Sequence, residues 1–184
     1  MKKVKKVLIV IPPEKYENEE LLNSLAIFDS AGILYEIASL EKGAINGHPV
    51  GVAEATEKLN DLHKSATKDY KGILVIGGPQ SRDYLWNNGE LHKIIRNFDK
   101  EGLLIGAVSN SVPVLANADI LVRRETAAPD DQEIIHLLIK RDARYQNMPV
   151  VSDEHVITAK STEYASELAK RMAEAILITP EITI

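Results

Sequence analysis

The chain has 184 residues, a length that suits one domain with a sizeable core and is short for two. Hydrophobic residues make up 45% of it and charged residues 27%, which is ordinary for a folded protein and argues against intrinsic disorder. The formal net charge of −5 disfavours nucleic acid and anionic membranes as partners, because both are themselves negatively charged. We therefore expect a small molecule or another protein as the partner.

Cysteine is absent, which excludes disulfides, cysteine-ligated zinc and thiolate catalysis. The basic start of the chain is followed by an apolar run of only five residues, Val7 to Ile11. That run is shorter than the core of a signal peptide and far shorter than a membrane span. A cytoplasmic protein is the resulting expectation.

The first half of the chain alternates between strand and helix patterns. Val7–Ile11 has the β-branched character of a strand buried on both faces. A helix is predicted over Glu19–Ala31, ending at Gly32, and a second strand over Ile33–Leu40. In the segment from Lys42 to Val52, Asn46-Gly47 predicts a hairpin turn.

The same alternation continues to the end of the chain. The predicted elements are a short helix around Leu59–Ala66, a strand over Ile73–Ile76 followed by Gly77-Gly78-Pro79, a helix over Glu90–Lys100, a strand over Leu103–Val108, a helix starting near Val112, a helix through Ile134 and Leu138, strands near Val150 and Val156–Thr158, and a final helix over Thr162–Leu177. This order predicts one α/β domain over residues 1–184: a doubly wound, flavodoxin-like, mostly parallel sheet flanked by helices, with a small hairpin excursion.

Ligands of such sheets bind beyond the carboxyl ends of the strands. Three segments lie there: Pro12 to Glu17, Gly77 to Ser81, and Ser109 to Ser111. The last is a sharp turn between a buried strand and a helix. Such a turn can carry a catalytic nucleophile.

The sequence resembles the ThiJ/PfpI family, which includes intracellular proteases, the parkinsonism-associated deglycase and glyoxalase-type enzymes. The matching segments, in order, are VLIVIPPEKYENEEL, EKGAINGHPV, DYKGILVIGGPQSRDYL, GLLIGAVSNSVPVLANADIL and PVVSDEHVITAKS. They span nearly the whole chain. The resemblance implies the fold of class I glutamine amidotransferases and self-association as a homodimer or larger homo-oligomer. No cofactor is expected, because the dinucleotide and Walker patterns are both absent.

The resemblance also implies where a site would be. The family carries a nucleophilic cysteine at the elbow, where this chain has Ser109, and many members have a histidine next, where this chain has Asn110. An acidic residue from the first βα loop, matched by Glu17, would contact the nucleophile. Gly77 and Gly78 match the glycine pair that supplies a backbone N–H to the oxyanion, and Ser111 completes the set of binding candidates.

Three of these positions depart from the family pattern: Ser109, Asn110 and Pro79. A hydroxyl needs an adjacent base to act as a nucleophile, and Asn110 cannot accept a proton. In an ungapped alignment Pro79 stands where the second glycine would donate its N–H, and proline has none. A one-residue shift of the loop would give that role to Gly78.

Two simpler interpretations stay open. The segment from Ser109 to Ser111 is also typical of a polar turn that caps the following helix, and Glu17 is also typical of an acid near a helix start, favoured by the helix dipole. The five histidines are scattered and no metal-ligand spacing is present, so no metal site is expected. Tyr84 and Trp86 would line a pocket or an interface.

Two functional hypotheses follow. In the first, the chain is a non-catalytic or weakly active family member that binds a small molecule or protein partner. In the second, it is a hydrolase or glyoxalase/deglycase-like enzyme that uses Ser109 with Glu17.

Overall fold

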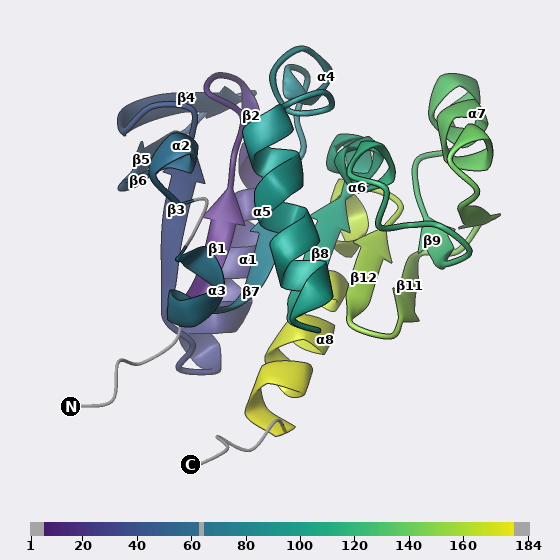
Figure 1. Cartoon of the computed structure of the whole chain (residues 1–184). Coiled ribbons are helices and arrows are strands. Elements are labelled where there is room, and N and C mark those ends of the chain that lie inside the picture. The colour runs from purple at the N-terminus through teal and green to yellow at the C-terminus, as the bar shows by residue number, and fades with distance from the viewer. Residues whose placement is uncertain (1–5, 63–64, 179–184) are drawn as a thin grey trace.

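A computed structural model of the chain describes residues 6–62 and 65–178. Its centre is a seven-stranded sheet in which every neighbouring pair is parallel except one edge pair, β11 and β12 (Figure 1). In spatial order the strands are β11 (Val150–Asp153), β12 (Val156–Ala159), β8 (Leu104–Val108), β7 (Tyr70–Val75), β1 (Lys6–Val10), β3 (Tyr35–Ser39) and β6 (Glu57–Lys58). This confirms the predicted mostly parallel α/β architecture.

Helices cover both faces of the sheet, as Figure 1 shows, with α5 in front of it and α1 behind. One face carries α1 (Asn18–Ser30) and α8 (Ala165–Ile178), which pack against each other. The other face carries α2 (Leu59–Leu62), α3 (Ala66–Asp69), α5 (Gly89–Lys100) and α6 (Val112–Asn117).

The central strand β1 shows how the sequence produces these two cores. Successive side chains of a strand point to opposite faces, so Val7 and Ile9 pack with α1 and α8 while Leu8 and Val10 pack with α5. All four side chains are fully buried. An uninterrupted apolar run is therefore required of this strand, because both of its faces are covered.

Smaller elements lie at the margins of the sheet. They are the strands β2 (Tyr16–Glu17), β4 (Gly43–His48) and β5 (Val52–Ala55), the parallel pair β9 (Glu125–Ala127) and β10 (Arg144–Gln146), the helices α4 (Ser81–Tyr84) and α7 (Gln132–Lys140), and the 3₁₀ turns η1 (Ser109–Ser111) and η2 (Thr162–Tyr164).

The hairpin was predicted with the wrong turn. Asn46 lies inside β4 and pairs with Val52, so the chain turns at residues 49–51, after a cis His48-Pro49 bond. Gly47 serves a different purpose: a Cβ there would lie 2.8 Å from Cζ of Tyr16. The glycine leaves room for the tyrosine ring, and the positive φ of the turn, 111°, falls on Gly51.

Other boundaries differ slightly from the prediction. The expected helix around Leu59–Ala66 consists of α2 and α3, and His63, predicted to lie on it, is outside the described residues. The short elements β6, α4, β9 and β10 were not predicted, because two to four residues are too few to show a periodicity.

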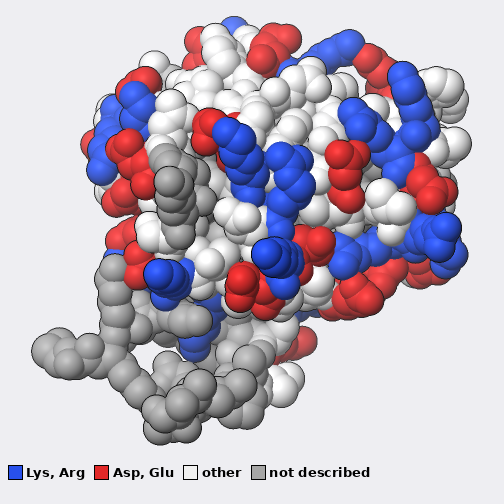
Figure 2. Space-filling model, viewed as in Figure 1, with Lys and Arg blue, Asp and Glu red and all other residues white. Residues whose placement is uncertain are grey.

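The surface carries charges of both signs in close alternation on the face shown in Figure 2. Within the described ranges, no helix is long and apolar enough to cross a membrane.

Candidate functional site

The carboxyl ends of β1, β7 and β8 meet at one edge of the sheet, and the chain makes its sharpest turn there. β8 ends at Val108, and Ser109 follows with a φ of 54°. That left-handed conformation costs a residue with a side chain about 1–2 kcal/mol. Ser109 is half-buried and Asn110 is exposed. The predicted elbow is therefore present, with a strained residue at its tip.

Ser111 is placed differently from the prediction. Its side chain is fully buried, and its hydroxyl accepts a hydrogen bond from the Val108 N–H at 2.9 Å. The same hydroxyl lies 2.7 Å from the Val75 carbonyl oxygen and 2.8 Å from that of Val108, to which it can donate. The Ser111 side chain thus joins the ends of β7 and β8. It is unavailable to a ligand, because its bonding capacity is used by the backbone.

The acid at the elbow is Glu20, which sequence reasoning missed. Its side chain is fully buried and accepts hydrogen bonds from the Gly77 N–H at 2.7 Å and from the Thr162 hydroxyl at 2.9 Å. Burial raises the pKa of Glu20 to about 8, and the charge of Glu17 acts in the same direction, against the hydrogen bonds from Gly77, Thr162 and Ser109. The carboxyl group is therefore mostly protonated at neutral pH.

The glycine pair brings three segments together. A Cβ on Gly77 would lie 3.1 Å from both a Glu20 carboxylate oxygen and the Val108 carbonyl oxygen. Gly78 has a φ of 134°, and a Cβ there would lie only 2.5 Å from the Lys15 carbonyl oxygen. Gly78 needs to be glycine because of its positive φ and the close approach of Lys15, and at Gly77 a Cβ would be tightly packed, because the loop passes between the elbow and the first βα loop.

This packing bears on the predicted oxyanion donor. The Gly77 N–H already donates to Glu20, and Pro79 has no N–H. Of the donors that the sequence suggested in this loop, the Gly78 N–H is the one that remains.

Glu17 lies beside this cluster. It precedes α1 at the cap position, its N–H donates to the Gly77 carbonyl oxygen at 2.9 Å, and its side chain is half-buried. Strand β2 pairs with β4 so that Glu17 stands opposite His48. Tyr16 pairs with Gly47, and its ring covers the face of the two strands on which a Gly47 side chain would lie. Because successive residues of a strand alternate between faces, the side chains of the next pair, Glu17 and His48, point to the opposite face. No signal in the sequence indicated this neighbour.

The other described histidines have different surroundings. Nε2 of His92 lies 2.9 Å from the Trp86 carbonyl oxygen, and Nε2 of His155 lies 2.8 Å from Oδ1 of Asp99. His136 lines a cleft on α7. Within the described ranges, no group of three or more potential metal-ligating side chains occurs.

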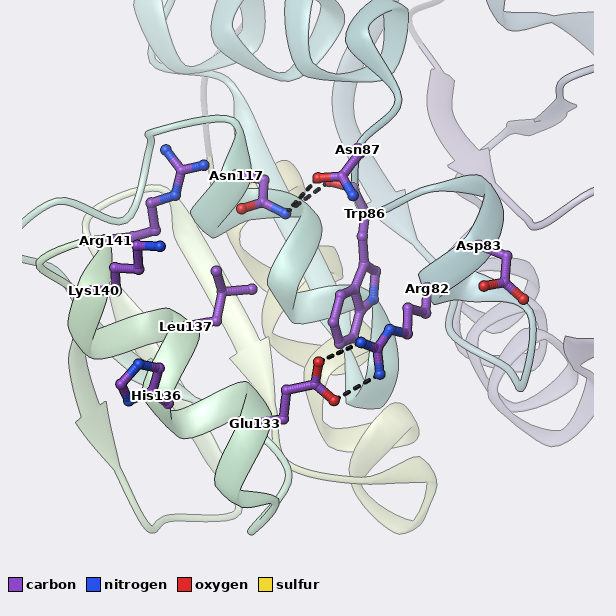
Figure 3. A pocket seen from close by; sticks show the side chains of 10 residues that line it. All are labelled: Arg82, Asp83, Trp86, Asn87, Asn117, Glu133, His136, Leu137, Lys140 and Arg141. Carbon is purple, nitrogen blue, oxygen red and sulfur yellow. Dashed lines mark hydrogen bonds and ion pairs between the residues drawn. The ribbon is translucent and has the colours of Figure 1, made fainter.

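Trp86 connects the elbow with that cleft. Its indole N–H donates to the Asn110 carbonyl oxygen at 2.7 Å, and its ring lies 5.3 Å from the Arg82 guanidinium. Arg82 in turn makes a two-pronged ion pair with Glu133 on α7. Trp86 thus forms part of the wall of this cleft (Figure 3). Tyr84 is exposed, and its hydroxyl donates to Glu14 at 3.0 Å.

Comparison with known proteins identifies this arrangement. The sequence model of the DJ-1/PfpI family matches residues 5–175. The chain belongs to the DJ-1/PfpI family. One relative is the uncharacterized protein MJ0967 of Methanocaldococcus jannaschii, which is 34% identical over 171 residues. The matched region covers 93% of this chain and 82% of that protein.

Solved DJ-1/PfpI structures share the fold at lower identity. A ThiJ/PfpI domain protein from Brachyspira murdochii has a TM-score of 0.89 at 18% identity, covering 97% of this chain and 99% of its own. DJ-1beta from Drosophila melanogaster has a TM-score of 0.79 at 20% identity, covering 93% and 89%. DJ-1 from Schizosaccharomyces pombe has a TM-score of 0.81 at 15% identity, with coverage of 96% and 93%.

Proposed function

We propose that this DJ-1/PfpI protein binds a small molecule or a protein partner at the elbow and does not carry out thiol chemistry. In this proposal Ser109 occupies the position at which other members of the family carry the nucleophilic cysteine. The chain contains no cysteine, so a thiolate cannot form at the elbow or anywhere else in it.

The observation that carries the proposal is the complete burial of the Glu20 carboxyl group beside the elbow, where the Gly77 N–H and the Thr162 hydroxyl hold it. A serine hydroxyl becomes nucleophilic when an adjacent base removes its proton. Glu20 interacts with Ser109, and its pKa of about 8 keeps it mostly protonated at neutral pH. A neutral, fully buried carboxyl group does not take the proton of the Ser109 hydroxyl, so that hydroxyl and the exposed Asn110 are suited to hydrogen bonding with a ligand.

The test is methylglyoxal consumption by the native protein, the Ser109→Ala variant and the Ser109→Cys variant. We expect no turnover from the first two. We expect measurable turnover from Ser109→Cys, because it supplies the missing thiol to a site that still holds its buried acid. Turnover by the native protein that vanishes in Ser109→Ala would overturn the proposal.

A second candidate function is hydrolysis by Ser109 with Glu17, and the register of β2 and β4 favours it. The register places His48 beside Glu17 and directs both to the same face, and the Glu17 N–H is bonded to Gly77 in the loop that packs against the elbow. A histidine oriented by a carboxylate is a suitable base for a serine hydroxyl. Loss of ester hydrolysis in both Ser109→Ala and His48→Gln, with the fold intact, would establish this function instead.

We further propose that the protein acts in the cytoplasm and self-associates, as the family resemblance implies. A neighbouring copy would then be able to contribute groups to the elbow. Sedimentation equilibrium measures the oligomeric state directly, and a strict monomer at all concentrations would reject self-association.

A further inference from the structure

A cleft of about 590 Å³ lies between α4 and α7, beside the elbow but outside it. Figure 3 shows its outline: Trp86 and Arg82 on one side, His136, Lys140 and Arg141 on the other, and Asn87 and Asn117 closing one end. Nothing in the proposed function uses these side chains.

The cleft has an excess of positive charge, although the whole chain has a net charge of −5. Glu133 is neutralised by its ion pair with Arg82. In Figure 3 the Asp83 carboxylate lies beyond Arg82, on the side away from α7. One guanidinium nitrogen of Arg141, Nη1, donates to Oδ1 of Asp119 at 3.0 Å.

Lys140 and His136 are the remaining basic side chains of the cleft. Within residues 6–62 and 65–178, neither has a hydrogen-bond or ion-pair partner. They lie on the α7 face that lines the cleft, four residues apart. An anionic group placed between them would interact with the Lys140 ammonium group and with the His136 imidazole.

The rest of the lining is suited to an organic body. Leu137 projects into the middle of the cleft from α7, opposite the Trp86 ring (Figure 3). Two amides, Asn87 and Asn117, are hydrogen-bonded to each other at 3.3 Å at the end of the cleft. Ligand sites typically combine such an apolar surface with a few polar groups that fix orientation.

We propose that the α4–α7 cleft is a second binding site, for a small organic anion that carries a carboxylate or phosphate group on a planar or apolar body. The anionic group lies at Lys140 and His136, and the body lies between Leu137 and Trp86. Because the indole N–H holds the Asn110 carbonyl oxygen, an occupant of the cleft contacts a side chain that also supports the elbow.

Trp86 is the single tryptophan of the chain, so its fluorescence reports on the cleft directly. The experiment titrates the native protein with phenyl phosphate, and with benzoate to compare the two anionic groups. We expect a saturable change in fluorescence with one or both compounds, and a weaker response to inorganic phosphate, which lacks the apolar body. Saturation with either compound identifies the anionic group that the cleft accepts.

Two variants locate the binding. Lys140→Gln should weaken the affinity about tenfold, since it removes a charged partner of the anion. Lys170→Gln, which removes the same charge from an exposed position on α8, should leave the affinity unchanged. No saturable change with either compound up to about 10 mM, or equal affinities for the two variants, would overturn the proposal.

Discussion

The buried carboxyl of Glu20 should make the stability of the fold depend on pH. A group whose pKa is higher in the folded state than in the unfolded state favours folding at low pH, and that contribution is lost as the pH rises towards the folded-state value. For Glu20 the two pKa values are about 8 in the fold and 4.5 as the reference for an exposed glutamate. The loss should therefore occur across the pH range between them.

Its size follows from the difference between the two pKa values. Each pH unit within this range reduces the free energy of unfolding by about 1.4 kcal/mol. Between pH 5 and pH 7 the native protein should therefore lose roughly 2–3 kcal/mol through this one group. The Glu20→Gln variant keeps a side chain of the same shape that cannot ionise, so it should not show this loss.

The assay is urea unfolding of both proteins at several pH values from 5 to 8. The quantity to compare is the difference between the two free energies of unfolding, because other titrating groups contribute equally to both. Glu19→Gln is the matched control: it removes a carboxylate from the exposed side of the same helical turn. A difference between native protein and Glu20→Gln that stays constant with pH would refute the reasoning.

Three further changes test the packing around the elbow. Ser109→Gly should be about 1 kcal/mol more stable than Ser109→Ala, because both lack the hydroxyl that hydrogen-bonds Glu20 and only glycine adopts the positive φ of this position without strain; equal melting temperatures of these two variants would show that the strain is absent. Ser111→Ala should cost about 1–3 kcal/mol, since it leaves buried backbone groups without their partner, and urea unfolding that matches the native protein would contradict this role. Gly106→Ala should cost about 1–3 kcal/mol, because its Cβ would lie 2.6 Å from Sδ of Met172. Gly89→Ala, where a Cβ meets no atom within 4 Å, is the control in calorimetry. Equal melting temperatures of Gly106→Ala and Gly89→Ala would show that Met172 moves away from the added methyl group without cost.

The sequence was sufficient for the parts of the fold that depend on local periodicity. The buried run around Val7–Ile11 and the helix that became α5 were predicted to within a few residues, because their apolar patterns reflect which faces are covered. Asn46-Gly47 indicated a false turn. Its local signal was typical, but the need for Gly47 comes from the ring of Tyr16, a residue far away in the sequence.

In the candidate site, too, the features set by a local pattern were predicted and those set by distant residues were not. The elbow at Ser109 was predicted from the change of strand to helix, and the structure places a strained residue there. Glu20 was not predicted, because an acid in the first turn of a helix ordinarily faces water. Its burial depends on Gly77 and Thr162, which lie 57 and 142 residues later in the chain. No local pattern contains that information.

The hydrogen bond from Thr162 to Glu20 also has a consequence for the order of assembly. During synthesis Thr162 follows Glu20 by 142 residues, and the α8 helix that packs on α1 comes directly after it. Until they arrive, one side of the carboxyl group is open to water and should ionise like an ordinary glutamate. The neutral acid at the elbow is therefore acquired only when α8 docks on α1.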